Sequence, residues 1–252
     1  MLGWALNEEA NLPLYVERAE TFLRSVTNDF ELVLIDDGST DATWALMNEL
    51  AATRSWLKPM QNPVNRGSGF CYRRAIASAS KAHCFAQTVD WSYDITRLGQ
   101  SLHLLSDFDV LQGIREDTFT PEGLWKRSDN PWKAVVSFVN FGLIRLLFRL
   151  PLRDYQNVTI CPTQLVQSLP LEANSSFANP EVLLKMWWHG ASFVEIPTGF
   201  RKRERGTATG TRVRSILRSI TEIFGYWCRW VLFNGYPNRK RGRVSRSASL
   251  GE

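Results

Sequence analysis

The sequence predicts an α/β domain built on a mostly parallel sheet flanked by helices. Short apolar runs alternate with longer amphipathic stretches along most of the 252 residues, as in strand-helix units joined by right-handed crossovers. The run Leu32–Ile35 has the length and composition of a strand buried on both faces. It ends in Asp36-Asp37-Gly38-Ser39, which places polar groups at the carboxyl edge of the sheet. Ligands of open α/β sheets bind at that edge, although two aspartates there can also act only as turn and cap residues.

The other elements follow from the same two periodicities. Only residues 2–6 are available for a first strand, which is therefore expected to be short. Thr40 or Asp41 is expected to cap the helix that follows the central strand. Pro197 is expected to stop the last strand, because proline removes a ladder hydrogen bond. Expected helices cover 12–25, 42–51, 72–82 and 182–188. Expected strands cover 32–35, 109–113 and 192–196, and a further strand is expected to end over 87–90.

Two stretches are unusually apolar for a soluble domain. Residues 134–150 are apolar nearly all round, which fits either a buried helix or a helix in the plane of a membrane interface. Residues 211–233 alternate arginines with aromatic and aliphatic residues, and predict an amphipathic membrane-interface helix. No run of about 18 uncharged apolar residues occurs, so no membrane-spanning helix is predicted. We therefore expect one α/β domain over 1–210, this amphipathic extension over 211–233, and a basic disordered tail over 234–252.

The charge is concentrated at one end of the chain. Residues 201–252 hold 13 of the 30 Lys/Arg but only 3 of the 25 Asp/Glu. Such a segment attracts phosphate groups, anionic lipid or nucleic acid, and nucleic acid is disfavoured because no recognition motif accompanies it. The four cysteines have no metal-ligand spacing, and predict reduced thiols in a cytosolic compartment.

A series of polar motifs follows the strands in a fixed order. They are Asn7-Glu8, Asp36-Asp37-Gly38, Asn65-Arg66-Gly67-Ser68-Gly69, the acidic stretch 88–94, Gly113-Ile114-Arg115 and Arg203-Glu204-Arg205-Gly206. In that order and spacing the chain resembles the family-two inverting glycosyltransferases, which have the GT-A nucleotide-sugar-binding fold. Within that family it is similar to the branch that glycosylates polyprenyl phosphates, which includes the dolichyl-phosphate mannosyltransferases. The resemblance covers roughly residues 5–210.

The resemblance implies a role for each motif. Arg115 and Arg203 would face phosphates, with which a guanidinium pairs bidentately. Asp154 would lie on the acceptor side, either as the base for a hydroxyl acceptor or, beside a lipid phosphate that is already anionic, as an orienting group. Glu181 matches a family carboxylate, although a surface glutamate is an equally good interpretation. The residues implied to bind the donor nucleotide are Asn7, Glu8, Asp36, Asp37, Gly38, Asn65 and Gly67.

The cation site implied by the resemblance is incomplete. The family has a DxD motif for Mg²⁺ or Mn²⁺, and here Thr88 stands in place of the first aspartate. Asp90 occupies the second position and Asp94 lies downstream. Because magnesium binds through one or two carboxylates together with phosphates and water, we expect a weak cation site at Asp90 and Asp94. The alternative is a metal-independent or inactive domain.

The resemblance therefore implies inverting transfer from a UDP- or GDP-linked sugar to a polyprenyl phosphate, by a protein resting on the cytoplasmic, inner face of a membrane. Three alternatives stay open. In the first, the fold is the same but the acceptor is a sugar or protein hydroxyl. In the second, the domain binds nucleotide sugars without turnover, and in the third it is a nucleotidyltransferase, for which no Gly/Arg/Lys-rich entry loop is visible.

Overall fold

Three parallel strands form the N-terminal part of the fold. They are β1 (Leu2–Ala5), β2 (Leu32–Asp36) and β3 (Leu57–Gln61), in the order β1-β2-β3. The structure is a computed structural model that describes residues 1–115, 131–200, 213–233 and 241–246. The first strand is as short as expected, and it pairs along its whole length with β2.

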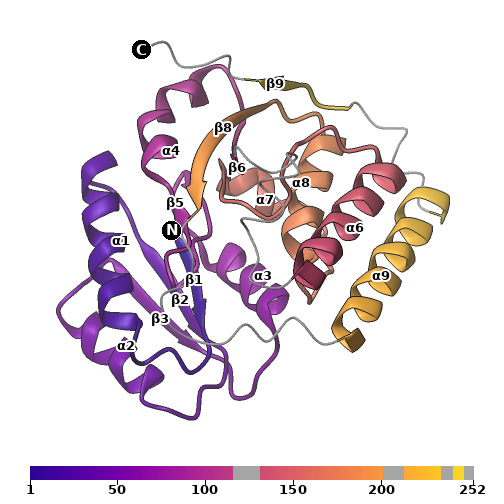
Figure 1. Cartoon of the computed structure of the whole chain (residues 1–252). Helices are drawn as coiled ribbons and strands as arrows, with labels where there is room; N and C mark the ends of the chain where they lie inside the picture. Colours follow the sequence, from indigo (N-terminus) through magenta and orange to yellow (C-terminus); the bar gives the residue numbers. More distant parts are fainter. Residues whose placement is uncertain (116–130, 201–212, 234–240, 247–252) are drawn as a thin grey trace.

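Strand β2 is buried on both faces, as its apolar run predicts. Val33 and Ile35 belong to one hydrophobic core, which also includes residues of α3 (Ser68–Ser78), and Leu32 and Leu34 belong to another. This second core includes residues of α1 (Leu12–Val26) and α2 (Thr43–Ala52). Figure 1 shows α1 and α2 on one side of the parallel strands and α3 on the other. Successive side chains of a strand point to opposite faces, so each core takes alternate residues.

A mixed sheet continues the parallel one. The Leu2 amide of β1 donates to the carbonyl of Phe85 (2.8 Å), and the Leu2 carbonyl accepts from the amide of Gln87 (3.0 Å). Residues 85–87 directly follow β4, so this segment connects the two sheets. The mixed sheet has the order β4-β7-β6-β8-β5, and β9 pairs with β8. Its strands are β4 (His83–Cys84), β5 (Tyr93–Asp94), β6 (Val110–Arg115), β7 (Thr159–Pro162), β8 (Phe193–Phe200) and β9 (Val244–Arg246).

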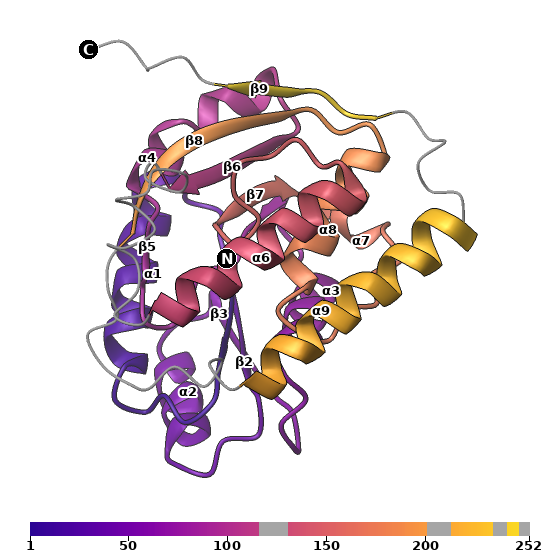
Figure 2. The ribbon, with the colours of Figure 1, turned by 45° about the vertical axis from the view of Figure 1, so that its right-hand side comes forward.

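The remaining helices cover the mixed sheet and its ends. In both views α6 and α9 run side by side (Figure 2). None of the helices in the described part of the chain is both long enough and apolar enough to cross a membrane. These helices are α4 (Thr96–Gln100), the 3₁₀ helix η1 (Leu102–Ser106), α6 (Pro131–Phe148), α7 (Thr163–Gln167), α8 (Ala178–Trp188), α9 (Val213–Trp227) and the π-helix η3 (Cys228–Phe233).

Two strand ends differ from expectation. The strand expected to end over 87–90 ends earlier, at Cys84, and residues 88–91 form a turn closed by the Trp91 amide on the Thr88 carbonyl (2.9 Å). Strand β8 runs through Pro197 and does not stop there. β9 pairs with residues 193–195 and β5 with residues 199–200. Within the described chain that edge has no partner at Pro197, so its missing N–H disrupts no ladder.

Two helix predictions are also shifted. The helix expected over 72–82 begins at Ser68, directly after the glycine turn, and ends at Ser78. The helix after β2 begins at Thr43 with Ala42 at the cap position, so neither expected residue occupies that position. The Asp41 carboxylate nevertheless accepts the Thr43 amide (3.0 Å), which satisfies one amide of the first helical turn.

The C-terminal third of the chain differs from expectation in two ways. Helix α6 is not buried all round: Ile144 and Phe148 are buried, whereas Leu146 is 74% exposed. The tail expected to be disordered is ordered over residues 241–246. There Gly242 donates to the Trp187 carbonyl (2.8 Å) and β9 pairs with β8. The expectations for 234–240 and 247–252 lie outside the described residues.

Candidate active site

The loops that follow β1 and β2 are cross-linked at the carboxyl edge of the parallel strands. The Asn7 side-chain oxygen accepts the Thr40 amide (2.8 Å), and the Asn7 amide donates to the Ser39 hydroxyl (2.9 Å). The Glu8 amide donates to the Thr43 hydroxyl (2.9 Å). Asn7 has a φ of 55°, in the left-handed region that asparagine tolerates better than most residues. The first two sequence motifs are therefore brought together, as predicted.

Asp37 ties the third motif to the second. Its buried carboxylate accepts the backbone amides of Arg66 (2.9 Å) and Gly67 (2.9 Å) and the side-chain amide of Asn62 (2.8 Å). The Cys71 thiol is a further hydrogen-bonding partner of this carboxylate. Asp37 therefore organises the Asn65–Gly69 turn, and its contact with the donor base stays a prediction.

Asp36 shapes its own turn. Its carboxylate is fully buried and accepts the Ser39 amide (3.1 Å) and the Gln61 side-chain amide (3.0 Å). This role matches the turn-forming function expected for it. The carboxylate therefore holds the loop after β2 against the end of β3.

Glycine is required where these turns meet. Gly38 has a φ of +76°, and a Cβ there would lie 2.7 Å from the Asn65 amide nitrogen. A Cβ on Gly69 would lie 2.4 Å from the Asn174 carbonyl carbon. Only glycine permits such close backbone approach. Gly38 thus lets the two turns lie backbone against backbone, and Gly69 lets the second turn lie against the backbone at Asn174.

The acidic stretch 88–94 carries the two carboxylates predicted to hold a cation, Asp90 and Asp94. The Ser92 amide lies 3.2 Å from an Asp90 carboxylate oxygen and 3.3 Å from the Thr88 hydroxyl. Asp94 lies on β5 and accepts the Thr96 amide (3.1 Å) at the start of α4. Over the described ranges, no group of three or more His, Cys, Asp or Glu side chains is arranged to hold a metal ion. These donors fit a cation held through one carboxylate together with phosphate and water oxygens.

Arg115 and Asp154, predicted to have separate roles, form a bidentate ion pair. The Arg115 Nε and Nη2 atoms lie 2.7 and 2.8 Å from the two Asp154 oxygens. Burial alone would lower the pKa of Arg115, but the Asp154 carboxylate raises it. Asp154 also accepts the Gln156 amide (3.0 Å). A carboxylate paired through both oxygens is fixed in orientation, and its role towards the acceptor stays a prediction. Arg203 lies outside the described residues.

Glu181 is not the surface glutamate that one interpretation expected. It is completely buried, where it accepts the amides of Glu172 and Ala173 (both 2.8 Å). The buried Lys185 ammonium lies 2.6 Å from it. Glu181 therefore stabilises the connection that precedes α8, and within the described chain it does not line the pocket.

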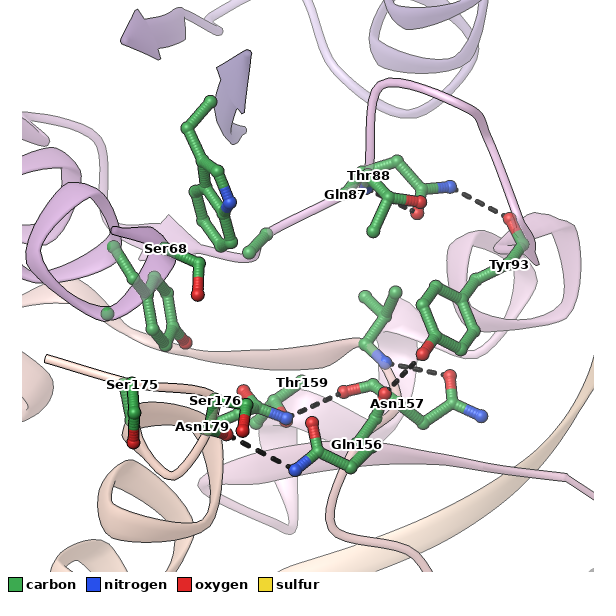
Figure 3. A pocket seen from close by; sticks show the side chains of 16 residues that line it. Ser68, Gln87, Thr88, Tyr93, Gln156, Asn157, Thr159, Ser175, Ser176 and Asn179 are labelled. Carbon is green, nitrogen blue, oxygen red and sulfur yellow. Dashed lines mark hydrogen bonds between the residues drawn. The ribbon is translucent and has the colours of Figure 1, made fainter. Parts of the chain in front are cut away.

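A pocket of about 170 Å³ lies between these motifs (Figure 3). Ser68 and Gly69 belong to the glycine turn, Thr88 and Tyr93 belong to the acidic stretch 88–94, and Gln156 follows Asp154. Within the described chain, none of the residues assigned individually to the donor, the phosphates, the cation or the acceptor lines the pocket. The sequence analysis did not identify wall residues such as Trp4, Tyr72 and Gln156. An aromatic residue on a strand or helix is usually interpreted as a core residue, and a carboxamide in a loop has no local sequence pattern that marks it. The lining residues are Trp4, Ser68, Gly69, Tyr72, Ala86, Gln87, Thr88, Tyr93, Gln156, Asn157, Val158, Thr159, Ser175, Ser176, Ala178 and Asn179.

The fold and the loops at its carboxyl edge define a GT-A domain, the α/β architecture of nucleotide-sugar-dependent transferases. The chain belongs to glycosyl transferase family 2, whose sequence profile matches residues 5–165. This confirms the family and fold expected from the motifs.

Individual relatives are distant. Glycosyltransferase AglD of Haloferax volcanii is 25% identical over 248 residues, which cover 96% of this chain and 37% of that protein. A dolichyl-phosphate beta-glucosyltransferase of Dictyostelium discoideum is 26% identical over 136 residues, which cover 49% of this chain and 42% of that protein. The chain thus matches less than half the length of either relative.

A solved structure supports the fold. Glucosyl-3-phosphoglycerate synthase from Mycobacterium tuberculosis, in complex with Mn²⁺, UDP and phosphoglyceric acid, superposes with a TM-score of 0.59 at 17% identity. The match covers 89% of this chain and 77% of that one. At this identity the likeness concerns the fold alone.

Proposed function

We propose that the domain transfers a hexosyl group from a UDP- or GDP-linked sugar to a polyprenyl phosphate, with inversion at the anomeric carbon. The observation that carries the proposal is the hydrogen-bonded set of loops at the carboxyl edge of β1 and β2. There Asn7 is bonded to Thr40, Glu8 to Thr43, and Asp37 to the turn 65–69. In a family-two domain this edge of the sheet suits the donor nucleotide.

The choice of acceptor rests on two further observations. The polyprenyl-phosphate relative described above supports a lipid phosphate. The ion pair of Asp154 also supports a lipid phosphate as the acceptor, because Arg115 donates to both Asp154 oxygens. A phosphate oxygen is already anionic and needs no base, whereas a hydroxyl acceptor does. The lipid phosphate oxygen attacks the anomeric carbon as the bond to the diphosphate breaks, and the nucleoside diphosphate leaves.

The charge of the leaving diphosphate requires stabilisation. Asp90 would hold a divalent cation, which would neutralise the diphosphate oxygens when bound. We assign Arg203 to the same diphosphate. Asp94 accepts the Thr96 amide at the start of α4, and we assign it a secondary role as a second carboxylate near that cation.

The same proposal places the protein at the cytoplasmic face of a membrane. Several large apolar side chains are exposed on the neighbouring helices α6 and α9 and on η3: Val139, Leu146, Phe224, Leu232 and Phe233. Such residues suit a lipid interface, and anionic lipid adds about 1 kcal/mol per nearby basic residue. We expect co-sedimentation with anionic vesicles, weakened in the double variant Leu232→Ser/Phe233→Ser. Equal binding of the variant would remove this face from the proposal.

Donor binding is tested by thermal shift with UDP, GDP and their sugars, each with and without Mn²⁺. We expect one nucleotide to raise Tm in a cation-dependent way, and Asp90→Asn to abolish the cation dependence. No shift with any nucleotide, from folded protein, would contradict the proposal. The second candidate is a non-catalytic nucleotide-sugar-binding domain, suggested by Thr88 in place of an aspartate in the cation turn. Donor binding without any transfer would support it instead.

A further inference from the structure

None of the described residues that line the pocket shown in Figure 3 carries a charged side chain. Its lining consists of hydroxyl groups, carboxamides, two aromatic rings close together, and small apolar residues. The rings are those of Trp4 and Tyr72, whose centroids are 5.5 Å apart. Aromatic faces beside neutral hydrogen-bonding groups match a sugar ring, which presents C–H groups on its faces and hydroxyls on its edge.

Several neutral groups in the wall keep hydrogen-bonding capacity. The Gln156 and Asn179 NH₂ groups donate to the carbonyls of Ser176 (3.2 Å) and Tyr155 (2.9 Å), so each side-chain oxygen is left to accept. No hydrogen bond within the described chain engages the Tyr72 hydroxyl. Burial raises the pKa of Tyr72 well above its usual value, so this hydroxyl stays protonated and neutral.

We propose that this pocket holds the sugar ring of the donor and selects an uncharged sugar over one that carries a carboxylate. The inference rests on the proposed function. Its place in the molecule supports the sugar as occupant, because Thr88 adjoins the turn assigned to the diphosphate and Gln156 adjoins the Asp154–Arg115 pair. The lipid phosphate is a poorer occupant, since its charge has no partner among the lining residues.

Selectivity follows from desolvation. A carboxylate that leaves water for a wall whose described side chains are all uncharged, without a cationic partner among them, loses several kcal/mol. A neutral hydroxyl in the same place exchanges water for the Tyr72, Gln156 and Asn179 groups at little cost. The pocket therefore discriminates by rejecting charge as well as by fitting the neutral ring.

The test compares donors that differ only at C6. Binding is measured by calorimetry for UDP, UDP-glucose and UDP-glucuronate, and for GDP, GDP-mannose and GDP-mannuronate. In the pair whose nucleotide binds, we expect the acid to bind on the order of 100-fold more weakly than the neutral sugar. Equal affinity within that pair would overturn the pocket assignment and leave the nucleotide site standing. Failure of UDP and GDP themselves would overturn the proposed function and this assignment together.

Variants at the rim separate pocket effects from general repulsion by the diphosphate. Ser176 is exposed and lines the pocket, so a longer side chain is accommodated there. Ser176→Lys is expected to reduce the ratio of the affinities for the neutral and the acidic sugar nucleotide at least tenfold. Ser176→Met adds a side chain of similar length without a charge, and is expected to leave this ratio unchanged. Tyr72→Phe is expected to weaken neutral-sugar binding without changing the affinity for UDP or GDP. If lysine and methionine behave alike, the sugar does not occupy this pocket.

Discussion

At the scale of single residues, the glycines and carboxylates of the motifs act mainly on each other. Asp37 holds the amides of the next turn, and Gly38 lets that turn approach. The sequence predicted that these residues would meet, because parallel strands bring their carboxyl ends to one edge. It could not predict how many acceptor positions Asp37 would use internally. That number depends on the backbone path of residues 62–67, which no local pattern specifies.

Gly38→Ala tests the contact between the turns. A methyl group there meets backbone 2.7 Å away, and alanine disfavours a φ of +76°, so we expect a loss of more than about 1 kcal/mol in the free energy of unfolding. Gly142→Ala is the matched control, because nothing lies within 4 Å of the added Cβ in helix α6. Urea unfolding measures both. Similar stability for the two variants would contradict the described approach of the turns.

A double-mutant cycle tests the Arg115–Asp154 pair. Arg115→Met leaves the buried Asp154 carboxylate without its bidentate cation, and Asp154→Asn takes both carboxylate contacts from Arg115. Each variant is therefore expected to cost about 3–5 kcal/mol of stability. The double variant is expected to lose clearly less than the sum of both. Strict additivity, measured by urea unfolding, would show that the two side chains do not interact.

At the scale of elements, buried charges join pieces that are distant in sequence. Glu31, at the start of β2, contacts Lys58 of β3 and the Ser80 amide and hydroxyl after α3. Lys185 of α8 lies over the Trp230 ring of η3, 4.2 Å from its centroid. Helical spacing predicted α8, but a glutamate and a lysine four residues apart are usually a solvated pair. Their burial follows from the docking of η3, which sequence reasoning did not place.

Glu31 makes the stability of the sheet sensitive to acid. Burial would raise the pKa of Glu31 above its usual 4.5, but the hydrogen bonds from Lys58 and Ser80 lower it to about 2. Because the folded pKa lies below the unfolded one, the contribution to stability is complete above about pH 4.5 and is lost as the pH falls towards 2. The loss on acidification is therefore expected to be smaller in Glu31→Gln than in the wild type. Parallel stability curves between pH 5 and 2, measured by urea unfolding, would contradict this role.

Two ion pairs of the same spacing provide a matched comparison. Glu181–Lys185 is completely buried, whereas the i,i+4 pair Glu20–Arg24 is exposed. Lys185→Met leaves Glu181 buried without its cation, so we expect a loss of about 3–5 kcal/mol. Arg24→Met is expected to cost about 1 kcal/mol or less. Comparable losses in thermal or urea unfolding would mean that α8 is not held as described.

At the scale of the whole molecule, two sheets meet at the segment 83–87 and the motifs gather at one edge. The strand-helix alternation predicted the parallel half, because each βα unit is local in sequence. The mixed half was predicted less well. Strands β4 and β5 are two residues each and form only through partners more than 70 residues away, so their own composition does not indicate them. The pocket between the halves is likewise a product of tertiary assembly.

The measurement that tests the central claim most directly is the formation of an organic-extractable glycolipid from a labelled nucleotide sugar and a polyprenyl phosphate. The matched acceptor is the corresponding polyprenol, which lacks the phosphate. We predict labelled product with the phosphate only, and its loss in Asp90→Ala. Transfer to the polyprenol or to a soluble hydroxyl acceptor, with none to the phosphate, would contradict the account.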